Sequence, residues 1–233
     1  MTKFDTKWVQ AEKAKRKYVS ENGLYSEAEE HASCGVGLVV SIDGKASRGV
    51  VEAGIAALKA VWHRGAVDAD GKTGDGAGIH VQIPVPFFYD QIERTGHTPR
   101  MDELMAVGQV FLPRTDFGAQ ETCRTIVETE VLRMGYYIYG WRHVPVNVAC
   151  LGDKANATRP EIEQILISNS KGVNEETFER ELYVIRRRIE KAASAAGING
   201  VYLASLSCRS IIYKGMFLAE DIADFFPDLK DTR

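Results

Sequence analysis

The sequence predicts a globular domain of mixed helices and strands that follows a leader, residues 1 to 33. Of the 233 residues, 45% are hydrophobic and 26% are charged, a composition typical of a soluble chain able to bury a sizeable core. Apolar stretches with the period of a strand alternate with stretches that have the period of a helix. No internal repeat or low-complexity tract interrupts them. The pattern alone predicts only a mixed α/β class, because it cannot order the strands.

Between Cys34 and Leu112 the sequence predicts a strand, a helix and two further strands. The apolar run from Cys34 to Ile42 predicts a strand that turns at Asp43-Gly44. Apolar residues at helical spacing predict a helix from Val51 to Trp62. From Ala77 to Ile83, apolar residues alternate with others, the period of a half-buried strand, which Pro84 and Pro86 end. Met105 to Leu112 is a further predicted strand.

The second half predicts two longer helices and two more pairs of strands. An apolar stripe from Cys123 to Met134 predicts a helix that Gly135 stops. Asn174 caps a helix with an inward apolar stripe, and Gly197 ends it. The remaining expected elements are strands at Tyr136 to Trp141 and Val146 to Leu151, a hairpin of Val201 to Ser207 with Ser210 to Lys214, and a short closing helix at Ala219 to Phe226.

Cys34 opens the run Cys-Gly-Val-Gly-Leu-Val-Val directly after the leader. If the leader is cut away, Cys34 becomes the N-terminus. A terminal cysteine has a thiolate that attacks and a free α-amino group, with a reference pKa near ~8, that takes and returns the proton. The alternative is that Cys34 is a small buried hydrophobic residue at the start of a strand.

Three separated motifs favour the catalytic interpretation of Cys34. They are Cys34-Gly-Val-Gly, the run from His63-Arg-Gly-Ala to Thr73-Gly-Asp-Gly-Ala-Gly-Ile79, and Ser205-Leu-Ser-Cys-Arg-Ser-Ile-Ile-Tyr-Lys-Gly215. In this order they resemble the class II glutamine amidotransferases, and more narrowly the amidotransferase domain at the start of the glutamate synthase large subunit. The resemblance implies an α+β fold of the N-terminal-nucleophile hydrolase type. That fold is a four-layer αββα sandwich, with two antiparallel sheets between helical layers.

The resemblance also implies two parts of the chain: a propeptide, residues 1 to 33, and the N-terminal part of the amidotransferase domain, residues 34 to 233. The leader contains six Lys/Arg and six Asp/Glu and lacks the apolar core of a signal peptide. The segment just before Cys34 is small and polar, as a cleavable segment is. The alternative is an ordinary disordered or helical N-terminal arm.

The resemblance implies that Cys34 is the nucleophile and that Arg64 lies close to it and supports the site. A nearby guanidinium would lower the pKa of the thiol. The alternative for Arg64 is a structural role, in which its positive charge stabilises the C-terminus of the preceding helix. We assign this structural role to His63. Gly35 and Gly37 would let other backbone come close beside Cys34, since they have no Cβ. The turn around Asp75 is expected to be a plain glycine turn rather than a phosphate loop, because no Gly-Lys-Ser/Thr follows it.

Two motifs of the family are missing between Cys34 and Arg233. One is His-x-Arg-Tyr-Ser-Thr, whose arginine holds the carboxylate of glutamine, and the other is His-Asn-Gly, which meets the oxyanion. We therefore expect a fold that is incomplete at the C-terminus and a chain that is inactive alone, since one lost oxyanion donor costs about 10²- to 10³-fold in rate. The alternative function is a non-catalytic fragment, or a relic of the same fold that binds a ligand or partner.

Charge and cysteine use exclude several other classes. A net charge of −3 and a pI near 6.0 argue against nucleic-acid binding, and no apolar run has the roughly 20 residues of a membrane span. The four cysteines are widely spaced, which argues against zinc or an iron–sulfur cluster in this segment and fits a reducing cytoplasm. The resemblance implies glutamine as substrate. It also implies FMN and an iron–sulfur cluster in the full-length enzyme, with the remainder of the large subunit and a reductase small subunit or reduced carrier as partners.

Overall fold

The computed structural model describes residues 6–23, 26, 35–61 and 65–233. The contacts within the chain divide it into two compact units, Met1–Val36 and Gly37–Arg233. The first unit contains one described element, the helix α1 at Thr6–Asn22. The sheets and all other described helices belong to the second unit.

Helix α1 lies in the segment that is expected to be the leader. Its sequence is rich in Ala, Lys, Glu and Gln, which are good helix formers. Ion pairs Glu12–Lys15 and Lys17–Glu21 join side chains one turn apart. Trp8 and Tyr18 are more than half exposed, at 62% and 66%. The helix therefore rests on local propensity and has no buried apolar face.

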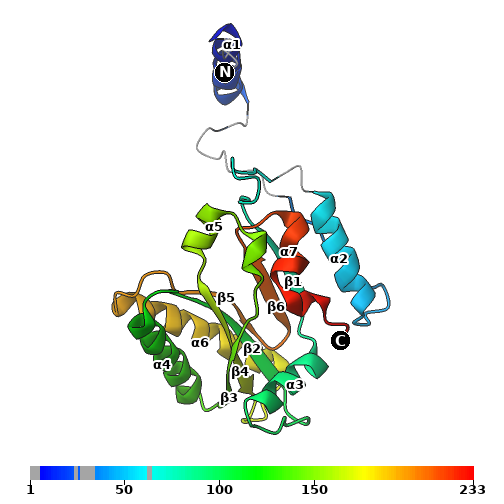
Figure 1. The fold of residues 1–233 in the computed structure, drawn as a ribbon, viewed down its shortest axis with the longest axis vertical. Helices are drawn as coiled ribbons and strands as arrows, with labels where there is room; N and C mark the ends of the chain where they lie inside the picture. Colours follow the sequence, from blue (N-terminus) through cyan, green and yellow to red (C-terminus); the bar gives the residue numbers. More distant parts are fainter. Residues whose placement is uncertain (1–5, 24–25, 27–34, 62–64) are drawn as a thin grey trace. The chain divides into compact units, whose positions relative to one another are not determined.

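The second unit contains two antiparallel sheets (Figure 1), as predicted. The larger sheet has the strand order β3-β4-β2-β5, and the smaller pairs β1 with β6. The strands are β1 (Ala77–Gln82), β2 (Met105–Leu112), β3 (Tyr137–His143), β4 (Glu161–Ser168), β5 (Tyr202–Ser207) and β6 (Ser210–Gly215).

Helices α4 and α6 cover one side of the larger sheet, and α2 and α7 lie on its other side (Figure 1). Asn174 accepts a hydrogen bond from the backbone N–H of Thr177, so α6 begins at its predicted cap. The helices are α2 (Arg48–Ala60), α3 (Val85–Arg94), α4 (Phe117–Arg133), α5 (Asp153–Thr158), α6 (Glu175–Ala195) and α7 (Ile222–Phe225), with 3-10 turns at Val148–Cys150, Ala219–Asp221 and Pro227–Lys230.

Two apolar cores lie on the two faces of the larger sheet. One joins Val127 and Ile185 of α4 and α6 to Ile165 and Ile167 of β4, all of them fully buried. The other joins the opposite face of the sheet to β1, β6, α2, α3 and α7, and includes Phe226. Each fully buried Ile or Phe contributes about 1.5–3 kcal/mol, so the two cores hold the layers together.

Most predicted elements are confirmed. The strands at Ala77–Gln82, Met105–Leu112 and Tyr137–His143 match the predicted ones to within two residues at each end. The two long helices follow the predicted stripes, and the short helical turns near the C-terminus begin at Ala219. The helix predicted to end at Trp62 ends at Ala60, and Trp62 lies outside the described residues.

Three predictions about strands are wrong. Residues 35–42, the described part of the predicted strand from Cys34, form no strand because no described strand pairs with them. The predicted strand Val146 to Leu151 is not formed: the segment contains a 3-10 turn at Val148–Cys150, whose cap Asn147 accepts from the N–H of Ala149. The last two strands do not pair as a hairpin: β5 joins the larger sheet and β6 pairs with β1. Between them, Ser207 Oγ accepts hydrogen bonds from the N–H groups of Arg209 and Ser210, and this turn directs the chain from one sheet to the other.

Three elements of the second unit were not predicted from the sequence: α3, α5 and β4. Helix α3 begins after Pro84 and contains Pro86 in its first turn, where a missing N–H costs nothing. Strand β4 is one of the two inner strands of the larger sheet. Its first residues, Glu-Ile-Glu-Gln, nevertheless place polar side chains on both faces of the strand. Both faces are buried: Glu163 pairs with Arg124 at 2.6 Å on one face, and Gln164 bonds to Gln109 at 2.8 Å on the other.

A buried polar network ties the C-terminal segment to the larger sheet. Arg142 of β3 donates two hydrogen bonds of 2.7 Å to the carboxylate of Asp228, and others to Gln91 and Gln164. Asp228 also accepts from the hydroxyl of Tyr213 at 3.1 Å. The side chains of Arg142 and Asp228 are 11% and 5% exposed. This pair therefore joins β3, β6 and the last 3-10 turn inside the core.

Candidate functional site

The structure leaves the two main site residues undescribed. Cys34, the predicted nucleophile, and Arg64, the predicted supporting residue, lie outside the described residues, as does His63. Gly35 is exposed and belongs to no helix or strand. A Cβ added to Gly37 would meet no described atom within 4 Å, so the described part of the chain shows no close backbone approach at Gly37.

The chain after Gly35 is apolar and exposed. Val36, Leu38, Val40 and Ile42 have exposed fractions of 93%, 86%, 67% and 104%. They belong to the apolar run that predicted a strand, but no described strand pairs with them. One edge of β1 is also unpaired by any described strand, since within the described part of the chain its only ladder partner is β6.

The chain that follows Arg64 forms a closed turn, which we call the glycine hairpin (residues 66–75). Val67 and Gly74 form an antiparallel bridge, and the N–H of Asp68 donates to the carbonyl of Thr73 at 2.9 Å. The carboxylate of Asp75 accepts the N–H of Ala66 at 2.9 Å. Asp75 therefore closes the glycine hairpin at its base, a structural role.

Glycines 74, 76 and 78 of this region allow close packing against the end of β6. A Cβ on Gly74 would lie 2.7 Å from the carbonyl oxygen of Phe217, and one on Gly78 would lie 2.9 Å from Cβ of Lys214. Gly76 has a φ of +115°, which other residues rarely adopt, and a Cβ added to it would lie 3.3 Å from the carbonyl oxygen of Gly215. These contacts support the plain glycine turn over a phosphate loop, because the space is filled by backbone.

A second contact holds the tip of the glycine hairpin against the start of α5. Asp70 accepts hydrogen bonds from the N–H groups of Lys72 and Thr73 and from the Thr73 hydroxyl, at 2.6–2.9 Å. These bonds, led by the Thr73 hydroxyl, lower the pKa of Asp70 to about 2. Gly152 is buried beneath them: its added Cβ would lie 2.0 Å from Oδ2 of Asp70 and 2.3 Å from Oγ1 of Thr73.

The three described cysteines are poor nucleophiles. Burial raises the pKa of the Cys123 thiol and of the Cys150 thiol. Burial, followed by a hydrogen bond to Glu179 at 3.1 Å, raises the pKa of Cys208 to about 12. The thiolate is the reactive form, so at neutral pH these three thiols stay protonated.

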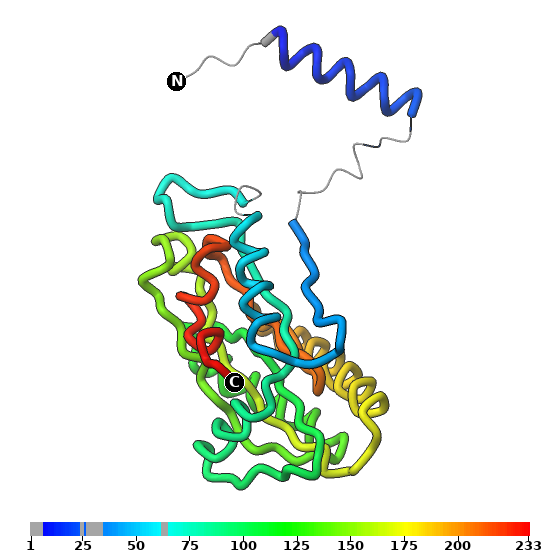
Figure 2. The backbone as a smooth tube through the Cα atoms, turned by 90° about the vertical axis from the view of Figure 1, so that its right-hand side faces the viewer, coloured from blue at the N-terminus to red at the C-terminus, as the bar shows by residue number. Residues whose placement is uncertain are grey.

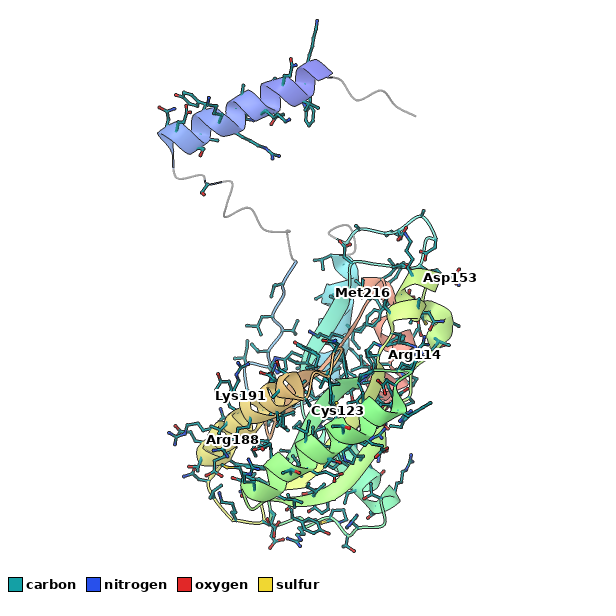
Figure 3. All side chains as sticks on the ribbon, turned by 90° about the vertical axis from the view of Figure 1, so that its left-hand side faces the viewer. Arg114, Cys123, Asp153, Arg188, Lys191 and Met216 are labelled. Carbon is teal, nitrogen blue, oxygen red and sulfur yellow. The ribbon has the colours of Figure 1, made fainter. Side chains whose placement is uncertain are left out.

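Several basic side chains of α6, β6 and the turn before β6 are held by structural hydrogen bonds or ion pairs. Arg209 donates to Glu175 at 2.7 Å, and Lys214 donates to the Tyr202 hydroxyl at 2.9 Å. Arg186 pairs with Glu190 on α6 at 3.0 Å. Arg188 and Lys191 lie on the exposed side of α6, well away from Asp153 at the start of α5 (Figure 3). None of these contacts creates a binding site.

Within residues 6–23, 26, 35–61 and 65–233, no group of three His, Cys, Asp or Glu side chains could hold a metal ion. Cys123, Cys150 and Cys208 are free and do not meet, so they do not fit an iron–sulfur cluster. No helix among the described residues is both long enough and apolar enough to cross a membrane.

The family model for "Glutamine amidotransferases class-II" matches residues 34–233. The chain belongs to this family. It is 65% identical over 209 residues to the glutamate synthase [NADPH] large chain of Azospirillum brasilense, a match that covers 90% of this chain and 14% of the relative. It is 37% identical over 205 residues to the chloroplastic ferredoxin-dependent glutamate synthase of Spinacia oleracea, covering 88% of this chain and 13% of that relative.

Another family member, the glutamate synthase [NADPH] large chain of Bacillus subtilis, is 36% identical over 214 residues, which cover 90% of this chain and 14% of the relative. The chain thus spans about one seventh of the length of the curated relatives it matches. The resemblance seen in three motifs extends over the whole segment from Cys34, with two antiparallel sheets as the family's fold requires.

Proposed function

We propose that residues 34–233 belong to the glutamine-hydrolysing domain of a glutamate synthase. The observation that carries this proposal is the match of the class II family model, which begins at Cys34. The identity of 65% to a glutamate synthase large chain supports the narrower assignment. The raised pKa values of the other described thiols leave Cys34 as the candidate nucleophile.

In the proposed reaction the thiolate of Cys34 attacks the side-chain amide carbon of glutamine. The α-amino group of Cys34, which has taken the proton of the thiol, returns that proton to the departing nitrogen as the C–N bond breaks, and ammonia leaves. Water then attacks the thioester, which releases glutamate and restores the thiol. The sum is glutamine plus water to glutamate plus ammonia. Arg64 would stabilise the thiolate, and Gly35 would leave room beside it.

The α-amino group of Cys34 is free only if residues 1 to 33 are removed, so we propose that they are a propeptide. Intact-mass measurement of the full-length protein from its native host should show an N-terminus at Cys34. A mature mass that includes Ser33 contradicts the N-terminal-nucleophile mechanism. The alternative, a non-catalytic relic, predicts the uncut chain and no reaction with glutamine.

The activity is tested in the full-length protein by Cys34→Ser. Glutamine-dependent glutamate synthesis should disappear, while ammonia-dependent synthesis should continue because it needs no glutaminase. Cys150→Ser is the matched control and should leave both unchanged, since that thiol is protonated at neutral pH. If Cys34→Ser retains glutamine-dependent synthesis, Cys34 is not the nucleophile.

We further propose that the ammonia serves amination of 2-oxoglutarate in the remainder of the large subunit, with FMN and an iron–sulfur cluster there. A reductase subunit or a reduced carrier would supply electrons, and the location would be the cytoplasm, where sparse free thiols persist. Since the carboxylate-binding and Asn-Gly motifs are missing from this segment, the segment alone should not hydrolyse glutamine at a useful rate.

A further inference from the structure

The outer face of α6 has a charge opposite in sign to the net charge of the chain. From its second turn to its last, the helix exposes six residues, which we call the basic face: Arg180, Tyr183, Val184, Arg187, Arg188 and Lys191. Four of them are cationic and none is acidic, although the whole chain has a net charge of −3. The helix, yellow in Figure 2, lies on the outside of the second unit.

Helical spacing gathers the basic face into two neighbouring rows. Within each row the residues are four positions apart, and the rows are Arg180, Val184, Arg188 and Tyr183, Arg187, Lys191. Residues three and four positions apart are neighbours on a helix surface, so the two rows lie side by side. Each row places one apolar side chain between two cations. These apolar side chains are open to solvent in the second unit, with exposed fractions of 63% for Tyr183 and 39% for Val184.

Two acidic residues of α6 that could neutralise the basic face are bound to other groups. Glu179 accepts a hydrogen bond from the backbone N–H of Cys208 at 2.9 Å. Glu181 accepts from Lys171 and from the Tyr136 hydroxyl. These bonds, led by the one from Lys171, lower the pKa of Glu181. Glu181 is therefore ionised at neutral pH, and its charge is already paired with that of Lys171.

Most cations of the basic face have no anionic partner. Arg187 pairs with Glu190. Arg188 reaches only the thioether of Met134, a weak acceptor, at 3.4 Å. Arg180 and Lys191 form no ion pair with any residue that the structure describes. Three of the four positive charges are thus free to bind an anionic group from outside the described part of the chain.

The residue types of the basic face fit a protein surface that carries acidic side chains. Tyr and Arg are enriched at the centres of protein interfaces, and a guanidinium can bind a carboxylate through two parallel hydrogen bonds. A helix that lies on a membrane needs a large apolar face, whereas only Tyr183 and Val184 are apolar here. A net charge of −3 and a pI near 6.0 argue against a nucleic acid.

We propose that the basic face of α6 docks an acidic surface in the remainder of the glutamate synthase large subunit. This inference rests on the proposed function, because that function supplies the remainder. The curated relatives are about seven times as long as the part that matches this chain. Domains of one polypeptide meet at an effective concentration on the order of mM. The remainder is therefore the protein surface that reaches the basic face most readily.

The test is hydroxyl-radical footprinting of the full-length enzyme, with the oxidation of Tyr183 measured by mass spectrometry. If the basic face is docked, Tyr183 should be oxidised at least about tenfold more slowly than in an unfolded peptide of the same sequence, because the centre of an interface excludes water. A free side chain that is 63% exposed should be slowed less than about twofold. Tyr139, which is 2% exposed, is the reference for a fully covered ring.

Charge reversal tests the acidic character of the docked surface. In Arg180→Glu combined with Lys191→Glu, two carboxylates would face the acidic surface and repel it, so the protection of Tyr183 should fall below about threefold. The matched control is Lys45→Glu combined with Lys59→Glu, since both lysines are exposed and lie outside α6. The control should leave the protection of Tyr183 unchanged. Arg180→Glu alone carries the test if the double variant does not fold.

Each outcome decides one point. Protection of Tyr183 below about twofold in the unaltered enzyme refutes the docking. Protection that survives the charge reversal refutes an acidic occupant. Protection that rises with enzyme concentration identifies a second copy, and protection that a nuclease removes identifies a nucleic acid; both refute docking to the remainder of the subunit. If Tyr183 is protected as expected but the enzyme releases no ammonia from glutamine, the proposed function fails and the docking stands.

Discussion

Breaking the buried pair of Arg142 and Asp228 should destabilise the chain more than any surface change. Asp228→Asn keeps the shape of the side chain and removes its charge. The guanidinium of Arg142 would keep its hydrogen bonds to Gln91 and Gln164, at 2.9 Å and 2.8 Å, and would face the new amide group instead of two carboxylate oxygens.

The magnitude follows from burial. Removing one partner of a buried ion pair costs about 3–5 kcal/mol, because the other charge stays buried without compensation. Arg142 keeps two neutral acceptors in Asp228→Asn, so we expect the lower end, about 3 kcal/mol. In Arg142→Met the carboxylate keeps only the Tyr213 hydroxyl, at 3.1 Å, so we expect about 4–5 kcal/mol. Either loss is a large part of a typical unfolding free energy of about 5–15 kcal/mol.

Urea unfolding of residues 1–233, followed by tryptophan fluorescence, measures both variants. With a slope of about 2 kcal/mol per molar urea, a loss of 3 kcal/mol lowers the midpoint by about 1.5 M. Asp224→Asn is the control: Asp224 pairs with Lys230 at 2.6 Å, but their side chains are 52% and 57% exposed, so the loss should stay below about 1 kcal/mol. Equal losses in Asp228→Asn and Asp224→Asn would refute the reasoning that burial decides the cost.

Three further results are expected. Cys208 should stay unlabelled by iodoacetamide at pH 8 in the folded chain, since a pKa of about 12 leaves roughly one thiolate in ten thousand; rapid labelling there would contradict its burial. Because the pKa of Asp70 is lowered, its contribution is present above its unfolded pKa of 3.8 and lost as the pH falls towards about 2; the protection factor of the Thr73 amide, its exchange rate relative to an unfolded chain at the same pH, should therefore fall across that window and stay constant above pH 5. Ile42→Ala should change the unfolding free energy by less than about 0.5 kcal/mol, whereas Ile165→Ala should cost about 2–5 kcal/mol, because their exposed fractions are 104% and 0%; similar losses in the two would show that residue 42 is buried.

Elements whose apolar residues lie on one face could be predicted from the sequence. The stripe of α6 and the alternation of β1 are one-sided, so the period shows both the element and its buried face. Strand β4 could not be predicted in this way. Its Glu163 and Gln164 are acceptable in a core only because Arg124 and Gln109 reach them from other elements, and no local pattern shows such partners.

The family can be assigned from residue types alone, since the motifs around Cys34, Arg64 and Asp75 are contiguous in the chain. In contrast, the separation of β5 and β6 into different sheets and the close approach of Gly152 to Asp70 and Thr73 are seen only in the folded chain. A motif consists of residues that are neighbours in the chain, so it can be recognised without knowledge of the fold. A close approach between residues some 80 positions apart exists only once hydrogen bonds and apolar burial have brought two segments together.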